Sequence, residues 1–321
     1  MLDDTGPARQ CGSGPPVTVK PDLPSNRVRT AGTGPPITVG ATMDLPASDG
    51  DGDPAGPSRH RTFSHLGFTA AALAEAKSGR RVSVCIPARN EATTVGAIVR
   101  TIVSELTGRG GGVPLLDEVI VVDDGSTDGT RAEAERAGAR VVVAGPRDPG
   151  DPGGKGQAMR VAVEAASGDL LAFVDADVTN FGAHFVTGLL GPLLLDSSTS
   201  LVKGFYERPL HGAPDGGGRV TELMAKPLID LLFPTLAGVI QPLAGETAAP
   251  RTVIDKCGLA DGYAVELALL IDVADAFGAD TVAQVDLGVR VHRNRPLSEL
   301  RPQATDILRS ALERAGVTGG R

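Results

Sequence analysis

The feature that most constrains the fold is a repeated alternation of short apolar runs with amphipathic stretches. Apolar strands are predicted at 82–86, 117–122, 140–144 and 170–174, and helices are predicted between them at 91–106, 127–137 and 156–166. This alternation predicts an α/β architecture, in which a parallel sheet carries helices on both faces. In such sheets, binding and catalytic groups collect at the carboxyl ends of the strands. The first half therefore resembles a nucleotide-binding module.

The rest of the chain is less regular. Residues 1–60 are rich in Gly, Pro, Ser and Asp and show no sustained hydrophobic period, so we expect a disordered extension there. The remaining expected elements are helices at 63–77, 184–195, 219–233, 263–277 and 299–315, and strands at 200–206 and 281–289. We divide the chain into the extension (1–60), a nucleotide-binding subdomain (61–200) and a second subdomain with the C-terminal helices (201–321).

Composition and charge argue against several classes of protein. The net charge of −8 and an aromatic content of 3% without Trp disfavour nucleic-acid binding. No uncharged apolar run has the length of a bilayer span, and the N-terminus lacks the layout of a secretory signal. The three cysteines are widely spaced, which indicates neither a disulfide framework nor a zinc site. We expect a cytoplasmic protein that binds neither nucleic acid nor membrane.

Acidic residues follow two of the predicted strands. Asp175-Ala176-Asp177 comes directly after the strand at 170–174. Residues i and i+2 project to the same side, so their two carboxylates can flank one divalent cation beside a diphosphate. Asp123-Asp124-Gly125-Ser126-Thr127-Asp128 closes an earlier strand, where a carboxylate can accept hydrogen bonds from a base or ribose. Both patterns are also typical of turns and helix N-caps, so the two interpretations stand side by side.

Basic and glycine-rich segments supply candidate anion sites. Gly153-Gly154-Lys155-Gly156 joins a turn, a cation and a helix start, although its spacing is not that of a Walker loop. Gly216 to Glu222 combines backbone N–H groups, the Arg219 guanidinium and the Thr221 hydroxyl, which suits an anionic acceptor or a simple capped loop.

Three further residues are candidates for the chemistry of the second half. His292 follows the strand expected at 281–289 and can complete the coordination of a cation near Asp177, although a lone His is more often a surface or core residue. Glu246 and Glu266 are isolated carboxylates among apolar residues. Glu266 is also compatible with an ordinary polar position on an amphipathic helix.

Taken together, these segments resemble family-2-like glycosyltransferases of the GT-A fold. The resemblance is carried by Pro87-Ala88-Arg89-Asn90-Glu91, Asp123 to Asp128, Gly154-Lys155-Gly156 and Asp175-Ala176-Asp177. The second half is similar to the glucosyl-3-phosphoglycerate synthase family, most specifically in Gly-Gly-Arg-Val-Thr-Glu-Leu at 217–223 and His-Arg-Asn-Arg-Pro-Leu at 292–297. The similarity covers about residues 63–315.

The resemblance implies a metal-dependent transferase with a Rossmann-like nucleotide-sugar-binding sheet and a C-terminal acceptor-binding region. That family moves glucose from UDP-glucose to the 2-hydroxyl of 3-phosphoglycerate with retention of configuration, uses Mg²⁺ or Mn²⁺, and suggests a homodimer. The implied donor site consists of Pro87, Ala88, Arg89, Glu91, Asp124, Lys155, Asp175, Ala176 and Tyr263, and the implied acceptor site of Gly218, Arg219, Thr221 and Asn294. Asp177 and His292 are the implied metal ligands, and Asp177 and Glu266 the implied catalytic residues.

The chain departs from that family pattern at several positions. Arg89, Asp124 and Ala176 replace a Leu and two Ser residues in the donor site. Glu207 and Thr247 stand where Arg and Tyr are usual, and the loop at 210–216 is short. A transferase of the same fold with another acceptor is therefore an alternative. A sugar-phosphate nucleotidyltransferase is a second one, although its usual glycine-rich signature is replaced here by Pro-Ala-Arg-Asn-Glu.

Overall fold

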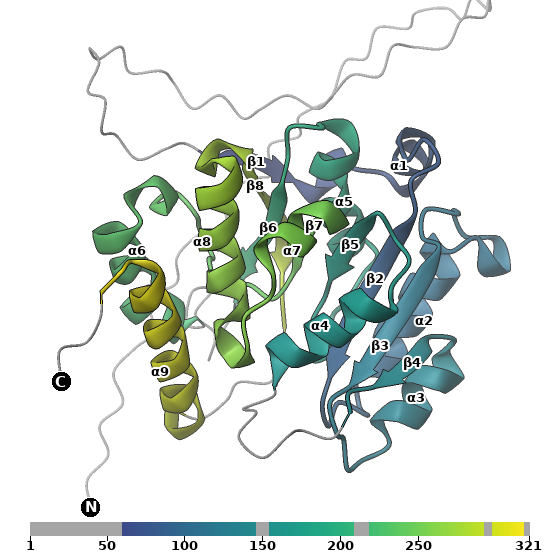
Figure 1. Ribbon diagram of the computed structural model, residues 1–321. Helices are drawn as coiled ribbons and strands as arrows, with labels where there is room; N and C mark the ends of the chain where they lie inside the picture. The colour runs from purple at the N-terminus through teal and green to yellow at the C-terminus, as the bar shows by residue number, and fades with distance from the viewer. Residues whose placement is uncertain (1–59, 146–153, 209–217, 292–296, 318–321) are drawn as a thin grey trace, which may run out of the picture. The chain divides into compact units, whose positions relative to one another are not determined.

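The computed structural model describes residues 60–145, 154–208, 218–291 and 297–317. These residues form an eight-stranded sheet with the strand order β1-β8-β6-β7-β5-β2-β3-β4 (Figure 1). The strands are β1 Arg61–Ser64, β2 Val82–Ala88, β3 Glu118–Asp123, β4 Arg140–Val143, β5 Leu170–Phe173, β6 Leu201–Glu207, β7 Thr247–Pro250 and β8 Val282–Val289. Strands from before and after residue 200 belong to this one sheet. The division of the chain into subdomains at residue 200 stays a prediction.

The sheet is mixed, whereas the sequence predicts a parallel one. All neighbouring strands pair in parallel except β7, which runs antiparallel to both β5 and β6. β7 has the sequence Thr-Ala-Ala-Pro, and so short a run of small residues ending in proline carries little strand signal. Its antiparallel direction brings Thr247 opposite Phe173, so β7 begins at the edge where β5 ends.

Helices cover both faces of the sheet, as the alternation predicts. One apolar cluster contains side chains of α1 Ala70–Ala76, α2 Val95–Leu106, α3 Thr130–Ala137 and α5 His184–Leu195. The other contains side chains of α4 Lys155–Ala165, α6 Lys226–Leu232, α7 Arg251–Cys257, α8 Val265–Phe277 and α9 Leu297–Arg314. Val84 and Ile86 of β2 belong to the first cluster and Cys85 to the second, because successive side chains of a strand point to opposite faces.

The prediction of one helix over 63–77 is wrong in its first part. The chain forms β1, then a 3₁₀ turn at His65–Gly67, and only then α1, whose N-cap Thr69 accepts a hydrogen bond from the Ala72 N–H. β1 pairs in parallel with β8, with Phe63 opposite Val285. That partner lies far along the chain, so a local hydrophobic pattern does not reveal it.

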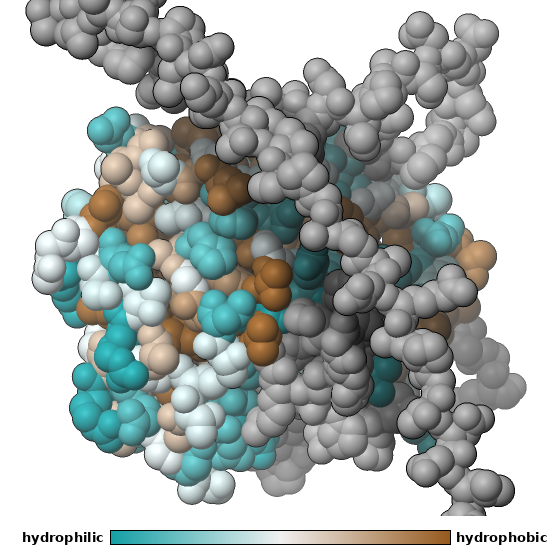
Figure 2. All heavy atoms as spheres, turned by 180° about the vertical axis from the view of Figure 1, so that it is seen from behind, coloured by the Kyte–Doolittle hydropathy of each residue, from teal (hydrophilic) through white to brown (hydrophobic). Residues whose placement is uncertain are grey.

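The expected disorder of residues 1–60 concerns a segment that, except for His60, lies outside the described residues. Seen from behind, the described surface is mainly hydrophilic or intermediate, with small separate hydrophobic patches (Figure 2). None of the helices in the four described ranges combines the length and the apolar character that crossing a membrane requires.

The Glu118 carboxylate connects the start of β3 with the start of β2 and the segment before β5, at the edge of the sheet opposite to the predicted site. Glu118 Oε1 accepts hydrogen bonds from the Ser83 hydroxyl at 2.6 Å and from the Ser167 N–H and hydroxyl at 2.5 and 2.8 Å. Burial alone would raise the pKa of Glu118, but these hydrogen bonds outweigh burial and lower it. The ionised carboxylate is therefore more stable in the folded state than in the unfolded chain.

We expect Glu118→Gln to lower the free energy of unfolding by about 1–3 kcal/mol near neutral pH, because charge-assisted hydrogen bonds are lost. The wild-type advantage exists above the pKa of an unfolded glutamate and disappears as the pH falls through the lower folded pKa. Urea denaturation between about pH 7 and pH 3 measures this. The exposed Glu313→Gln is the matched control, and a penalty for Glu118→Gln that does not change with pH would contradict this account.

Candidate active site

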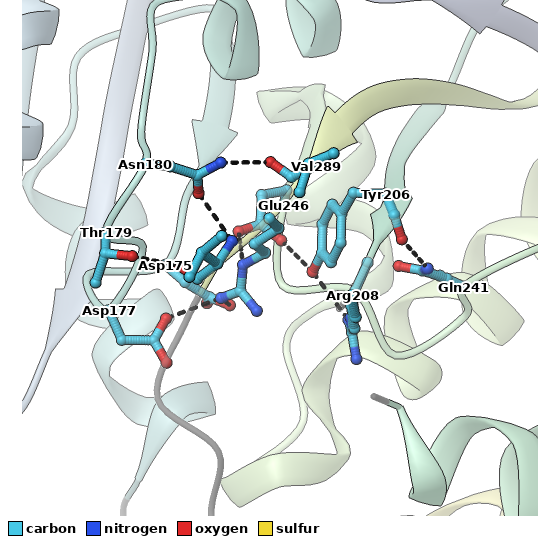
Figure 3. Close-up of polar contacts among 12 residues, drawn as sticks. Asp175, Asp177, Thr179, Asn180, Tyr206, Arg208, Gln241, Glu246 and Val289 are labelled. Atoms are coloured by element: carbon cyan, nitrogen blue, oxygen red, sulfur yellow. Dashed lines mark hydrogen bonds and ion pairs between the residues drawn. The ribbon is translucent and has the colours of Figure 1, made fainter. Parts of the chain in front are cut away.

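One buried guanidinium joins the two acidic residues that follow β5. Arg290, directly after β8, donates from Nη2 to Asp175 Oδ2 at 2.7 Å and to Asp177 Oδ1 at 2.8 Å. The Nε of the same guanidinium lies 3.1 Å from Glu246 Oε1. The side chains of Arg290 and Glu246 are 4% and 0% exposed, so this ion pair is almost completely shielded from solvent. Figure 3 shows Asp175, Asp177 and Glu246 converging.

A second cation connects Asp175 to Glu266. Lys155 opens α4, and its Nζ lies 2.5 Å from Asp175 Oδ1 and 2.7 Å from Glu266 Oε1 in the first turn of α8. Three residues that the sequence singled out from separate segments thus meet. Burial opposes the charged form of both partners, yet each charge stabilises the other, so the pKa of Lys155 is raised. The charges of Lys155, Arg290 and Arg208 likewise outweigh burial and hold the pKa of Asp175 well below its usual range.

Lys203 of β6 is a buried cation that sequence reasoning did not assign to the site. Its side chain is 1% exposed, and its Nζ donates to the Ala244 carbonyl at 2.6 Å. Burial lowers the pKa of Lys203 to about 8. The signal that could have identified it is a lysine inside an otherwise apolar strand, because a lysine is rarely buried so completely. The hydrogen bond holds the segment that leads into β7 and Glu246.

The predicted base-binding residues lie together where β2 and β3 end. The Asp124 N–H donates to the Ala88 carbonyl at 2.9 Å, and Arg89 Nη1 lies 3.7 Å from Asp124 Oδ2. Pro87 and Ala88 are the last residues of β2, and Glu91, which is 8% exposed, follows at the start of the next loop.

Two other acidic residues, the last residue of β3 and one in the loop that follows β3, stabilise turns instead. Asp123 Oδ1 accepts from the Ser126 N–H at 3.0 Å. Asp128 accepts from the N–H groups of Ala92 and Thr130 at 3.2 and 3.0 Å. The turn interpretation therefore holds for Asp123 and Asp128, while Asp124 faces Arg89.

The predicted sugar and acceptor residues lie on neighbouring segments. Tyr263 belongs to a 3₁₀ turn at Gly262–Ala264, directly before Glu266. Gly218 has a φ of 77°, Arg219 is exposed, and Thr221 is buried at 3% exposure at the start of a π-helical turn, Thr221–Ala225.

The structure shows the local contacts of three of the residues that depart from the family pattern. Thr247 is buried in β7, and its hydroxyl donates to the Val202 carbonyl at 2.8 Å. The Ala176 carbonyl accepts from the Thr94 hydroxyl at 2.6 Å, a contact that does not involve the residue-176 side chain. Glu207 is exposed at the end of β6, where its backbone carbonyl accepts from the Arg290 N–H at 3.0 Å.

The residues present fit a divalent cation in part. Asp175 and Asp177 offer the hard carboxylate oxygens that a divalent cation prefers. In this structure both carboxylates contact the positive Arg290 guanidinium. Within the described ranges, no three His, Cys, Asp or Glu side chains converge as a metal site. A cation on Asp177 therefore needs further ligands. His292 and Asn294, predicted for the metal and the acceptor, lie outside the described residues.

Comparison with known proteins agrees with this arrangement. Residues 83–196 match the family described as glycosyl transferase family 2. The glucosyl-3-phosphoglycerate synthase of Mycolicibacterium smegmatis is 48% identical over 80% of this chain and 85% of its own length. The chain belongs to the glucosyl-3-phosphoglycerate synthase family. The enzyme of the same name from Petrotoga mobilis is 41% identical over 74% of both chains.

Solved structures of a family member show the same fold. The crystal structure of the Mycobacterium tuberculosis synthase with Mn²⁺, UDP-glucose and phosphoglyceric acid has a TM-score of 0.72 and is 44% identical, covering 81% of this chain and 89% of that one. A second crystal structure of that enzyme, with Mg²⁺ and UDP, has the same TM-score at 42% identity. The GT-A fold expected from the sequence is thereby confirmed.

Gly245 lies in very close contact with the charged groups of the site. A methyl group on Gly245 would overlap both carboxylate oxygens of Asp175 and the Nζ of Lys155. We expect Gly245→Ala to lower kcat/KM for UDP-glucose by about a hundredfold, because it displaces charged groups that must be positioned closely. Steady-state kinetics measure this. Gly67→Ala is the control, since a methyl group at Gly67 has no neighbour within 4 Å. An equal, small effect of both substitutions would refute the role of this close approach.

Proposed function

We propose that this chain transfers glucose from UDP-glucose to the 2-hydroxyl of 3-phosphoglycerate, with retention of the anomeric configuration. The main support is the 48% identity to a glucosyl-3-phosphoglycerate synthase over 85% of that enzyme. The meeting of Lys155, Asp175 and Glu266 at one edge of the sheet supports it further, because such an edge is where α/β proteins bind nucleotides.

The proposed donor site has a base end and a sugar end. Pro87, Ala88 and Arg89, with Glu91 and Asp124, bind the uracil and its ribose at the ends of β2 and β3. Asp175, the backbone at Ala176 and Lys155 bind the ribose and diphosphate. Glu266 and Tyr263 contact the transferred glucose from the start of α8.

The proposed chemistry depends on stabilising the departing UDP. A Mg²⁺ or Mn²⁺ ion bound by Asp177 and His292 supplies charge neutralisation for the diphosphate. Lys155 adds a positive charge whose position is fixed by Asp175 and Glu266, so little rearrangement is needed as charge develops. Retention requires a carboxylate nucleophile or attack from the face that the diphosphate leaves. Glu266 is the carboxylate that we assign to the catalytic site, next to the transferred glucose.

The acceptor is proposed to bind through Gly218, Arg219, Thr221 and Asn294. A glycosyltransferase of the same fold with a different acceptor is the second candidate. It is favoured by Glu207, an exposed carboxylate where the family usually has arginine, next to Arg208.

The deciding experiment follows UDP release from UDP-glucose with Mn²⁺, with and without 3-phosphoglycerate, and the mass of the product. Acceptor-dependent UDP release with a glucosyl-phosphoglycerate product is the expected result.

We expect Asp177→Ala to reduce turnover by about a thousandfold or more, because charge neutralisation of the leaving group is lost.

The exposed Asp275→Ala serves as the control for Asp177→Ala. A folded Asp177→Ala variant with near-normal turnover would refute the metal assignment. Binding of UDP-glucose without turnover of 3-phosphoglycerate would refute the acceptor and favour the second candidate.

We further infer that the enzyme is cytoplasmic and forms a homodimer through its C-terminal helical region. The free thiols of Cys85 and Cys257 support a reducing compartment. Leu223 and Leu231, which are both 80% exposed beside the proposed acceptor segment, support a partner surface.

A further inference from the structure

Arg208, directly after β6, has a position that the proposed mechanism does not yet use. Its Nη2 donates to the Tyr206 hydroxyl at 2.9 Å, and its guanidinium lies over the Tyr206 ring at 4.8 Å from the centroid. The Tyr206 hydroxyl in turn donates to Glu246 Oε2 at 2.7 Å. Figure 3 shows Tyr206 between Glu246 and Arg208, with the guanidinium on the side away from Asp177.

The charge of Arg208 is not neutralised in the way that its neighbours' charges are. Arg290 pairs with three carboxylates and Lys155 with two. Across the described part of the chain, Arg208 makes no ion pair, and its buried Nε has no hydrogen-bond partner. Burial raises the pKa of Tyr206, so the hydroxyl that Arg208 contacts stays neutral. A half-buried guanidinium whose hydrogen bond goes to a neutral hydroxyl has unused capacity to bind an anion.

Arg208 also lies beside the segment proposed to bind the acceptor. A methyl group placed on Gly218 would be 3.5 Å from Arg208 Nη1 and 3.9 Å from the Thr221 Cβ. Arg208 is near enough to the donor side for its charge to act on Asp175. It therefore lies between the donor carboxylates and Gly218, whereas Arg219 is exposed.

We propose that Arg208 binds the carboxylate of the acceptor and thereby selects a 2-hydroxy acid. The proposal rests on the function proposed above. The reacting 2-hydroxyl is next to the carboxylate, whereas the phosphate is one carbon further away, so the cation nearer the donor matches the carboxylate. The planar guanidinium, held over the Tyr206 ring, can present two N–H groups to a planar carboxylate, which an ammonium group cannot do.

The test compares Arg208→Gln and Arg208→Lys with wild type in the full enzyme with Mn²⁺. Glutamine keeps a polar N–H donor at this position but is shorter and has no charge. We expect Arg208→Gln to raise KM for 3-phosphoglycerate by about ten- to a hundredfold, since a charged hydrogen-bonded pair is lost, with KM for UDP-glucose changed less than about twofold. We expect Arg208→Lys to recover part of the loss. Arg81→Gln, exposed and at the other edge of the sheet, is the control.

Two acceptor analogues distinguish the carboxylate from the phosphate. In inhibition by glycerol 3-phosphate, which lacks the carboxylate, Arg208→Gln and wild type are expected to behave alike. Inhibition by glycerate, which lacks the phosphate, is expected to weaken. The reverse pattern would overturn the carboxylate assignment. Unchanged KM for 3-phosphoglycerate, or equal increases in both KM values, would overturn the role of Arg208 altogether.

Calorimetric titration keeps this result separate from the proposed function. Wild type that releases no UDP in response to 3-phosphoglycerate would refute the proposed reaction, but titration of 3-phosphoglycerate into both proteins would still test Arg208. Weaker binding to Arg208→Gln supports the inference, and equal or undetectable binding by both proteins overturns it. If Arg208→Gln does not fold, Arg208→Lys is measured in the same way, and a KM for 3-phosphoglycerate equal to that of wild type would overturn the need for a guanidinium.

Discussion

The arrangement of the whole site depends on the buried ion pairs of Arg290. This single side chain contacts Asp175 and Asp177 after β5 and Glu246 before β7, while its own backbone follows β8. A charge removed from water is tolerated only when it is paired and hydrogen-bonded. Because Arg290 and Glu246 are almost completely buried, the strand ends that carry them must stay together for the sheet to keep its native pairing.

The antiparallel direction of β7 explains how this cluster can exist. The parallel strands β5, β6 and β8 end at the same edge, and β7 begins there. The segment that enters β7 therefore brings the Ala244 carbonyl, Gly245 and Glu246 against charged side chains from other strands. Lys203 holds that segment through its hydrogen bond to the Ala244 carbonyl. Only a residue without a Cβ fits at position 245, where the segment passes Asp175. A fully parallel sheet would carry this segment to the opposite edge.

Sequence reasoning predicted the parts of the fold that have local signals. The strands and helices between residues 82 and 174 follow the hydrophobic alternation. Lys155, Asp175 and Glu266, which the sequence marks as candidates, lie in contact with one another, and their functional roles stay predictions. β1 and β7 were missed because their pairing partners are distant and their own sequences are short. Arg290 was missed because no local motif marks an arginine whose acidic partners Asp175 and Asp177 lie 115 and 113 residues away in the chain.

The most direct test of this account is a double-mutant cycle on Arg290 and Glu246, measured by urea denaturation. We expect Arg290→Met alone to lower the free energy of unfolding by about 3–5 kcal/mol, because Glu246 is then left buried and unpaired. The double variant Arg290→Met/Glu246→Gln is expected to lose much less than the sum of the two single losses, since neither charge remains to be desolvated. Additive losses would contradict the central claim that this buried pair holds the strand ends together.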